Sequence, residues 1–376
     1  MKTRAAVLYT MDHAPPYNAS APLVVEDLEL DGPGAGEVLV ELVGAGLCHS
    51  DLSVINGSRP RVMPMVMGHE ASGVVREVGP NVYDLVEGDH VVFSFVPNCG
   101  HCVPCASGRA ALCENGAEAN TAGTLLSGAK RFKTADGEPL NHHLGVSAFS
   151  QLTVAAQESL VKIDKDVPLE KAALFGCGVM TGVGAVVNTA QVQAGYSVAV
   201  FGMGGVGLSA VMGARAVGAY PIIAVDLKDD KLQLAREVGA THTVNAAHND
   251  SVEVIREITN GGAFYTFESV GNARVLVQAY QATGRGGTTI SIGLPHPSKM
   301  FEIPAVSLVG EERTVKGSYM GSSVPRRDIP RYIAMYKAGI LPVDKLHTHT
   351  LSLDEINTGF DRLATADAVR QVIAFR

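Results

Sequence analysis

The pattern of apolar and polar positions divides the chain into regions with different periodicity. Through residues 1–170, short apolar runs alternate with polar residues and end at glycine-rich turns, as in 37–48, 71–79 and 87–95. Alternation with a period of two residues is typical of β-strands that bury one face. The pattern therefore predicts a β-rich region at the start of the chain.

From about residue 180 to residue 320, short apolar runs alternate with helical stretches. In the stretch 229–240, for example, apolar residues recur with helical spacing and the pattern ends at a glycine. Strands that alternate with helices favour a parallel sheet with helices on both faces. The predicted fold is therefore α/β, with a doubly wound parallel sheet in addition to the β-rich region. The strand candidates of the parallel sheet are 197–202, 221–226, 242–246, 264–271 and 288–293.

Two further segments need an interpretation. The segment 172–214 contains no Asp, Glu, Lys or Arg, and such a run can indicate a transmembrane helix. Its ten glycines and the polar residues at 188–193 interrupt it, so buried turns and a central strand are the better interpretation, and no membrane partner is expected. Near the end of the chain, 326–339 has the pattern of an amphipathic helix and 370–375 that of a strand.

Composition and charge narrow the class of protein. With 376 residues, 46% hydrophobic and 18% charged, the chain has the balance of a globular enzyme of two or three domains. Its formal net charge of −8 argues against a nucleic-acid partner, which would require basic surfaces. The first residues do not have the pattern of a signal peptide. We therefore expect a cytoplasmic, reducing location, in which the six cysteines are thiols or metal ligands.

A glycine-rich motif lies between the first two strands of the predicted parallel sheet. Gly202-x-Gly204-x-x-Gly207 follows a strand and opens a helix, and Asp226 ends the next strand. In a dinucleotide-binding unit, these glycines allow a tight turn, the approach of the pyrophosphate and close packing of helix on strand. A carboxylate at the end of the second strand accepts hydrogen bonds from a ribose and repels a 2′-phosphate. The motif predicts an NAD site; the alternative is a glycine-rich turn without a ligand.

Four cysteines within one short stretch predict a metal site. Cys99, Cys102, Cys105 and Cys113 can close a tetrahedral, all-thiolate zinc site that stabilises a loop, here about residues 97–115, and leaves no position for a substrate. A redox Cys-x-x-Cys pair and a nucleic-acid-binding zinc ribbon are the alternatives. The first lacks the neighbouring βαβ unit and the second lacks a basic surface.

The two remaining cysteines suggest a second site. Cys48, Cys177 and His69 would form a three-ligand set with one open position, as a catalytic zinc requires. Taken singly, each has a simpler explanation, since buried free cysteines are common and a histidine near glycines is often a turn residue.

Together these motifs resemble the zinc-dependent medium-chain alcohol dehydrogenases, most closely the liver-type branch. The resemblance extends over the whole chain and implies a Rossmann-type NAD-binding domain at 179–321. It also implies a β-rich, GroES-like catalytic domain made of 1–178 and 322–376. The segments that carry it are 44–52, 67–75, 99–113, 175–185, 201–207, 222–232 and 369–375.

The resemblance implies specific roles around the catalytic metal. Cys48, His69 and Cys177 would bind zinc, with Glu70 as a possible alternative ligand. Asp51 would orient the ring of His69, and Ser50 would pass on the proton of the substrate hydroxyl.

The remaining roles that the resemblance implies concern NAD and the substrate. His49 and Arg370 would contact the pyrophosphate, and Lys231 would contact the ribose. The NAD site would be completed by Gly205, Thr181, Val206, Ile292, Gly293 and Leu294. The substrate pocket would be lined by Phe95, His143, Leu144 and Arg59.

The implied reaction is reversible hydride transfer between NAD and a primary alcohol, aromatic or medium-chain, through a zinc-bound alkoxide. The cofactors would be NAD and two zinc ions per chain. The long segment 114–142 accompanies homodimers in the family, so a homodimer is expected. A polyol or secondary-alcohol dehydrogenase of the same superfamily and a non-enzymatic NAD-binding relative are the alternatives.

Two departures from the family pattern bear on the mechanism and the substrate. Ser53 occupies the position where relatives usually carry a histidine at the outer end of a proton relay, so a proton can pass there only through water. Arg59 and Arg61 stand in a segment that is acidic in the glutathione-dependent formaldehyde branch. A glutathione adduct is therefore not the expected substrate. The two arginines could bind an anionic substrate, although solvated surface charges are the simpler interpretation.

Overall fold

The computed structural model describes residues 1–375, which form two compact units. The first unit contains Met1–Cys177, Val324–Ile333 and the segment from His347 onward, and the second contains Gly178–Ser323 and Ala334–Leu346. The domains expected from the sequence differ from these units mainly at 334–346, which were assigned to the first domain as part of 322–376. Leu341, Val343 and Leu346 are completely buried, and Lys345 Nζ lies 2.6 Å from Glu237 Oε2 of the second unit. This segment therefore packs as part of the second unit.

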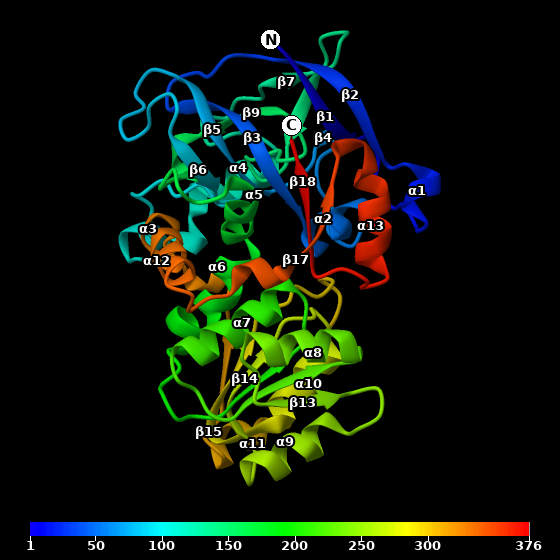
Figure 1. Ribbon diagram of the computed structural model, residues 1–376, viewed down its shortest axis with the longest axis vertical. Helices are drawn as coiled ribbons and strands as arrows, with labels where there is room; N and C mark the ends of the chain where they lie inside the picture. Colours follow the sequence, from blue (N-terminus) through cyan, green and yellow to red (C-terminus); the bar gives the residue numbers. More distant parts are fainter. Residues whose placement is uncertain (376) are drawn as a thin grey trace. The chain divides into compact units, whose positions relative to one another are not determined.

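The first unit is built on β-strands (Figure 1). Five strands close a barrel in the order β1-β2-β7-β8-β4, with Ala5, Leu28 and Phe132 in its apolar core. The barrel strands are β1 (Lys2–Leu8), β2 (Leu23–Leu30), β7 (Phe132–Lys133), β8 (Pro139–His142) and β4 (Met65–Val66).

A seven-stranded sheet forms the rest of this β-structure. Its order is β10-β6-β5-β3-β18-β17, and β9 also pairs with β3. Strand β3 is central, and β18, from the end of the chain, joins the sheet antiparallel to β3. This pairing explains why the two ends of the chain belong to one unit. The strands are β10 (Leu160–Ile163), β6 (His90–Phe93), β5 (Glu70–Val78), β3 (Glu37–Leu47), β18 (Arg370–Ala374), β17 (His347–Leu351) and β9 (Leu152–Ala156).

Short helices connect these strands. Helix α2 (His49–Ile55) directly follows β3, so residues at its start lie at the end of the central strand. The other helices are α1 (Tyr17–Ser20), α3 (Val103–Ala106), η1 (Ala110–Leu112), α4 (Glu114–Ala122), η2 (Gln157–Ser159), α5 (Leu169–Ala172), η3 (Ala173–Gly176), η7 (Leu353–Glu355) and α13 (Ile356–Ala364). Helix α12 (Pro325–Lys337) begins in this unit and ends in the other, with the boundary between Ile333 and Ala334.

The second unit contains a six-stranded, fully parallel sheet in the order β13-β12-β11-β14-β15-β16. The first strand of the unit, β11, is central and the chain winds outward from it in both directions, which is the Rossmann arrangement. The predicted fold class is thus confirmed, and the edge strand β16 is an addition that the pattern did not reveal. The strands are β11 (Val198–Phe201), β12 (Ile222–Asp226), β13 (His242–Asn245), β14 (Ala263–Glu268), β15 (Thr283–Ser291) and β16 (Thr314–Gly317).

Helices connect the strands of this sheet, as the alternating pattern predicts. They are α6 (Gly178–Gly184), the π-helix η4 (Ala185–Ala190), α7 (Gly205–Ala216), α8 (Asp229–Val238), α9 (Ser251–Thr259), α10 (Ala273–Ala282), α11 (Ala305–Gly310), η5 (Met320–Ser322) and η6 (Val343–Leu346). Among residues 1–375, no single helix has both the length and the apolar character needed to cross a bilayer; only the bent pair Leu169–Gly176 and Gly178–Ala190 passes that test jointly.

Candidate active site and metal centres

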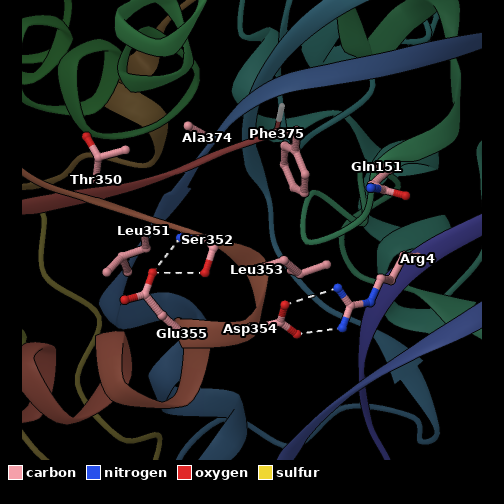
Figure 2. A pocket seen from close by; sticks show the side chains of 10 residues that line it. All are labelled: Arg4, Gln151, Thr350, Leu351, Ser352, Leu353, Asp354, Glu355, Ala374 and Phe375. Atoms are coloured by element: carbon pink, nitrogen blue, oxygen red, sulfur yellow. Dashed lines mark hydrogen bonds and ion pairs between the residues drawn. The ribbon is translucent and has the colours of Figure 1, made fainter.

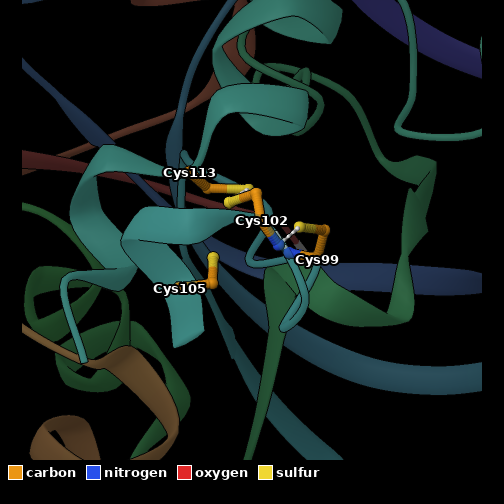
Figure 3. Close-up of side chains that lie close together, drawn as sticks. All are labelled: Cys99, Cys102, Cys105 and Cys113. Atoms are coloured by element: carbon orange, nitrogen blue, oxygen red, sulfur yellow. Dashed lines mark hydrogen bonds between the residues drawn. The ribbon is translucent and has the colours of Figure 1, made fainter. Parts of the chain in front are cut away.

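The four cysteines of the 99–113 stretch converge at one point of the first unit. Their sulfur atoms all lie within 4.8 Å of one another, and we call this group the cysteine lobe (Figure 3). Cys102 and Cys113 precede the first residues of α3 and α4, whose backbone N–H groups have no partner within the helix. The backbone N–H of Cys105 holds the pKa of the Cys102 thiol at about 6.

Backbone N–H groups point at the sulfurs of this lobe. Cys99 Sγ accepts from the N–H of Cys102, and Cys113 Sγ accepts from the N–H groups of Cys99 and Gly116, each at 3.4 Å. Such donors stabilise thiolates, which are the form that binds zinc. Four sulfurs from one loop with this support fit a closed structural zinc site, as the spacing predicts.

A second group consists of Cys48, His69 and Cys177, which we call the Cys–His cluster. Their ligand atoms also lie within 4.8 Å of one another, and all three side chains are buried. Cys48 lies between β3 and α2, His69 immediately before β5 and Cys177 immediately after η3. Three segments far apart in sequence therefore meet, as the resemblance implies.

Local backbone geometry places His69. The preceding Gly68 has φ +92°, and a Cβ there would approach Phe149 N to 2.7 Å, so both the conformation and the space demand glycine. His69 Nδ1 lies 2.8 Å from Asp51 Oδ1, and the other carboxylate oxygen of Asp51 accepts from the N–H of Cys48 at 3.2 Å. The predicted contact between Asp51 and His69 is present. With Nδ1 engaged there, Nε2 is the ring nitrogen available to a metal.

The electrostatics of the Cys–His cluster follow from burial and mutual contact. Burial disfavours a charged His69, but the carboxylate of Asp51 outweighs it and raises the pKa of His69 well above its usual value. A hydrogen bond with Cys177 lowers the pKa of the Cys48 thiol against the effect of burial, and the pKa of Cys177 rises correspondingly. Binding of a metal cation would displace the protons of these two thiols.

Glu70 adds a buried carboxylate beside this cluster. It is fully buried, and among the described residues neither of its oxygens has a hydrogen-bond partner. Burial raises its pKa to about 7, while Arg370, whose Nη1 lies 3.9 Å from Oε2, opposes the rise. A Cβ at Gly46 would lie 2.3 Å from Glu70 Oε1, so this glycine makes room for the carboxylate. A buried carboxyl group left without a hydrogen bond fits a site that receives a cation.

Two rings flank His69. The rings of Phe95 and His143 each meet the His69 ring edge to face, with centroids 5.4 and 5.6 Å away. His143 also brings Nδ1 to 3.3 Å from Asp51 Oδ1, a contact that the sequence did not reveal. Leu144, the next residue, is buried with φ +53°.

The remaining predicted residues of this unit lie on or near α2. His49 and Ser50 form its first turn, with His49 exposed and Ser50 half-buried. Ser53 Oγ donates to the carbonyl of His49 at 2.8 Å, and the N–H of Arg59 donates to the carbonyl of Ser53 at 2.7 Å. The hydroxyl proton of Ser53 is thus engaged by the helix backbone.

In the second unit, the glycine motif has the expected form. Gly202 follows β11 with φ +92°, and a Cβ at Gly207 would lie 1.8 Å from the carbonyl oxygen of Gly202, so the turn and the close packing both need glycine. A Cβ at Gly204 would meet nothing within 4 Å, which leaves open space before the first turn of α7. Helix N-termini with such space suit phosphate groups.

Asp226 also supports this loop directly. Its Oδ2 accepts from the N–H of Met203 at 2.6 Å, and its Oδ1 accepts from the N–H groups of Leu227 and Lys228. Lys231 is nearly buried on α8, and Thr181 and Val206 belong to α6 and α7, which pack so closely that a Cβ at Gly182 would lie 2.2 Å from Val206 O. Asp226 ends β12 and Val206 opens α7 after β11, so both lie at the carboxyl ends of strands, where ligands of such sheets bind.

Pattern reading missed Glu268, at the end of β14. Its buried carboxylate accepts from the N–H groups of Val270 and Gly271, both at 2.7 Å, and its backbone carbonyl accepts from those of Ile292 and Gly293. It thereby joins two loops at the carboxyl edge of the sheet, including the predicted NAD residues Ile292–Leu294. The sequence feature that could have identified Glu268 is an acidic residue at the end of an apolar strand, as at Asp226.

A separate hollow of about 470 Å³ lies in the first unit (Figure 2). Its charged side chains are all engaged. Arg4 forms two hydrogen bonds with Asp354, and Glu355 accepts from the N–H and hydroxyl of Ser352. It contains none of the predicted site residues.

The fold and the two clusters indicate a protein with a nucleotide-binding domain and two candidate zinc sites. Family models for the alcohol dehydrogenase GroES-like domain and for zinc-binding dehydrogenase match residues 34–165 and 205–338. The chain is 39% identical over 387 aligned positions to S-(hydroxymethyl)glutathione dehydrogenase of Paracoccus denitrificans, with both chains fully covered.

Two solved structures are also similar. An alcohol dehydrogenase zinc-binding domain protein from Burkholderia ambifaria has a TM-score of 0.94 and 38% identity, covering 100% of this chain and 99% of that one. Benzyl alcohol dehydrogenase from Acinetobacter calcoaceticus has a TM-score of 0.93 and 33% identity, covering both chains fully. The chain therefore belongs to the zinc-dependent medium-chain alcohol dehydrogenases, and the predictions of family, enzyme class and of zinc and NAD as cofactors are confirmed.

Proposed function

We propose that this enzyme transfers a hydride reversibly between NAD and a primary alcohol, aromatic or medium-chain. The observation that carries the proposal is the Cys–His cluster. Two thiols and an imidazole from three distant segments bring their ligand atoms within 4.8 Å of one another, beside the buried carboxylate of Glu70. Three protein ligands rather than four are typical of a catalytic zinc, because one position stays open for substrate.

The roles of the residues follow from this arrangement. Cys48, His69 and Cys177 would hold one zinc ion, and the cysteine lobe would hold the second. The bound ion supplies Lewis acidity toward the substrate oxygen. Asp51 keeps His69 in the tautomer whose Nε2 faces the thiols. Ser50 Oγ would accept the hydroxyl proton of the alcohol and release its own proton towards the nicotinamide ribose. Glu70 would serve as an alternative zinc ligand.

NAD, rather than NADP, is supported by the second unit. The open space at Gly204 and the N-terminus of α7 suit the pyrophosphate. The carboxylate of Asp226 ends β12 and would repel a 2′-phosphate. We propose that His49 and Arg370 supply the positive charge for the pyrophosphate, and that Lys231 contacts the ribose.

The substrate class rests on the pocket residues and on the arginines. Phe95 and His143 present ring faces and edges next to His69, which favours a flat or apolar substrate. One relative is named for S-(hydroxymethyl)glutathione and another for benzyl alcohol. The arginines at 59 and 61 stand where acidic residues are expected for an enzyme that binds a glutathione adduct. We therefore favour a substrate of the benzyl alcohol class over a glutathione adduct.

A substrate panel tests this proposal. Initial rates are measured with NAD and NADP for benzyl alcohol, a medium-chain alcohol, ethanol, sorbitol and formaldehyde with glutathione. We expect the highest kcat/KM for benzyl alcohol or the medium-chain alcohol with NAD, and two zinc ions per chain by elemental analysis. A preference for the glutathione adduct or for sorbitol would refute the substrate class, and one zinc per chain would refute the catalytic site.

We also propose a homodimer that forms through the sheet of the second unit. Strand β16 is at the edge of that sheet and all its residues are exposed. Beside it in the chain, α11 exposes Val306 and Val309 by 77% and 82%, an apolar surface unusual for a monomer. Light scattering should show a dimer, and Val309→Asp should weaken it; a tetramer would contradict the proposal. A cytoplasmic location stays a prediction.

A further inference from the structure

The turn that follows β14 lies between two loops of the predicted NAD site. We call residues 268–271 the β14 turn; the strand that leads into it pairs with the central strand β11. On one side the turn meets the glycine loop, because a Cβ at Gly202 would lie 2.6 Å from Val270 Cγ2. On the other side it meets the loop after β15, because a Cβ at Gly293 would lie 2.0 Å from the backbone nitrogen of Gly271. Both neighbours of the turn therefore depend on its shape.

Ser269 connects the β14 turn to the glycine loop. Its backbone N–H donates to the carbonyl of Phe201 at 3.0 Å, and its Oγ lies 2.9 and 3.0 Å from the carbonyl oxygens of Phe201 and Gly202. A Cβ at Gly207 would lie 2.8 Å from the same hydroxyl oxygen. The hydroxyl thus lies inside the glycine motif and holds the turn that precedes the N-terminus of α7, where a pyrophosphate binds.

Glu268 shapes the β14 turn and connects it to the loop after β15. The residue is 1% exposed, and its Oε1 accepts from the N–H groups of Val270 and Gly271, both at 2.7 Å. Its backbone carbonyl accepts from the N–H of Ile292 at 2.8 Å and from the N–H of Gly293 at 3.0 Å. The side chain of one residue therefore fixes the turn, and its backbone fixes the neighbouring loop.

The order of the strands assigns the two loops to different parts of the dinucleotide. In a doubly wound sheet each half binds one mononucleotide, and the ligand crosses where the strand order reverses. Asp226, the predicted partner of the adenosine ribose, ends β12 in the half formed by β11, β12 and β13. The half formed by β14, β15 and β16 is thus left for the nicotinamide mononucleotide. The β14 turn follows the first strand of this half.

We propose that Ser269 and Glu268 are positioning residues for NAD. Ser269 fixes the glycine loop for the pyrophosphate, and Glu268 fixes the loop of Ile292 and Gly293 for the nicotinamide half. The inference rests on the proposed NAD site of the second unit. It adds two residues that act through the backbone of that site rather than by contact with the dinucleotide.

Two ligands distinguish the two roles. ADP-ribose contains the adenosine and the pyrophosphate but no nicotinamide, whereas NADH contains all three. Ser269→Ala removes the hydroxyl, so its affinity for both ligands should fall by about 2- to 10-fold. Glu268→Met keeps the length of the side chain without an acceptor, so its affinity for NADH should fall about tenfold or more and its affinity for ADP-ribose by less than about threefold. The affinities are measured by titration calorimetry on the full-length, zinc-loaded protein without alcohol.

Two further variants separate positioning from general loss of stability. The amide oxygen of Glu268→Gln is an acceptor at the same side-chain length, so its affinity for NADH should stay within about threefold of the wild type. Thr266→Val removes a fully buried hydroxyl from the same strand, where it lies 2.8 Å from the hydroxyl of Thr283. This variant should unfold at a lower temperature and still bind both ligands as the wild type does, so it is the matched control.

The outcomes distinguish this inference from the NAD site on which it rests. A wild-type protein that binds neither ligand would refute the NAD site and the inference together. A wild type that binds both, with unchanged affinities in Ser269→Ala and Glu268→Met, would refute the inference alone, as would equal losses in Thr266→Val. Equal loss of both ligands in Glu268→Met would refute its role at the nicotinamide half. If Glu268→Met does not fold, Glu268→Asp, whose shorter side chain withdraws the acceptor from the turn, replaces it in the comparison with Glu268→Gln.

Discussion

The two clusters of the first unit contrast in how the chain builds them. The cysteine lobe takes four ligands from the single stretch 99–113, and three of them are only half-buried. The Cys–His cluster takes three buried ligands from the end of β3, the start of β5 and the end of η3. The first is a local structure near the surface, and the second is assembled by the whole sheet.

This contrast indicates what each ion does for the protein. The lobe consists of short helices and turns with few buried apolar residues, so its order depends on the metal. The ligands of the Cys–His cluster are held by strands, by Gly68 and by the hydrogen bonds of Asp51, all of which belong to the fold itself. Loss of the first ion should therefore reduce stability, and loss of the second should reduce activity.

Removing one ligand of the Cys–His cluster should have the largest effect. Cys177→Ala leaves two protein ligands for the catalytic zinc. The Lewis acidity of this zinc, which the substitution disrupts, stabilises the transition state by several kcal/mol. We expect kcat/KM to fall by about 10³-fold or more, since each 1.36 kcal/mol is a factor of ten. Elemental analysis should show one zinc, and the unfolding temperature should change by less than about 2 °C. Activity within tenfold of the wild type would remove the basis for a catalytic metal.

Removing one ligand of the cysteine lobe should produce the opposite balance. Cys102→Ala also leaves one zinc per chain, but we expect it to destabilise the protein by about 3 kcal/mol, or roughly 6 °C. The folded fraction should keep a near-normal kcat. Val103→Ala, at an exposed neighbouring position, is the control for changes in the loop itself. A stable Cys102→Ala protein with lost activity would reverse the comparison.

The same contrast governs how much the sequence could predict. The spacing of Cys99, Cys102, Cys105 and Cys113 was sufficient for the lobe, because ligands close in sequence are necessarily close in space. The Gly202–Gly207 loop was predictable for the same reason, and so was the alternation of strands and helices around it. The Cys–His cluster was different, because the spacing of its residues did not determine that they share one metal. The family resemblance assigned them to a single site.

Contacts between distant segments that the family does not fix were missed. The approach of His143 to Asp51 depends on the turn after β8 and on the position of α2, neither of which has a sequence pattern of its own. The assignment of 334–346 was missed because an amphipathic pattern shows that one face is buried, but not against which unit. Glu268 was missed because its partners are backbone N–H groups, which every residue offers.

The link between Asp51 and His69 offers a smaller test of the same comparison. Asp51→Asn preserves shape but removes the carboxylate that fixes the tautomer of His69. We expect zinc affinity at the Cys–His cluster to fall about 10–100-fold, or roughly 1.4–2.7 kcal/mol, with the lobe unaffected. Asp328→Asn changes another fully buried aspartate of the same unit, held by Arg327 and the N–H of Val324. If both variants release zinc alike, general destabilisation explains the result rather than the orientation of His69.

The prediction with the smallest effect compares His69 with a second buried histidine, His142. The comparison shows what the carboxylate of Asp51 contributes to the protonation of His69. His69 and His142 are equally buried, but Asp51 raises the pKa of His69, whereas burial and then the charge of Arg131 lower the pKa of His142 to about 3. His142 Nε2 accepts from the N–H of Arg131 at 3.1 Å, which requires the neutral ring.

Below its ordinary pKa of 6.5, the unfolded chain therefore binds a proton at His142 that the folded chain does not. This contribution to stability is complete above pH 6.5 and is lost progressively as the pH falls toward 3. Between pH 7.5 and 5.5 the loss should be about 1.4 kcal/mol. His142→Gln cannot titrate, so its stability in urea should fall less by about that amount over the same interval. An identical pH dependence in both proteins would show that His142 is protonated in the folded state, and that burial without a carboxylate does not suffice to keep a histidine of this barrel neutral.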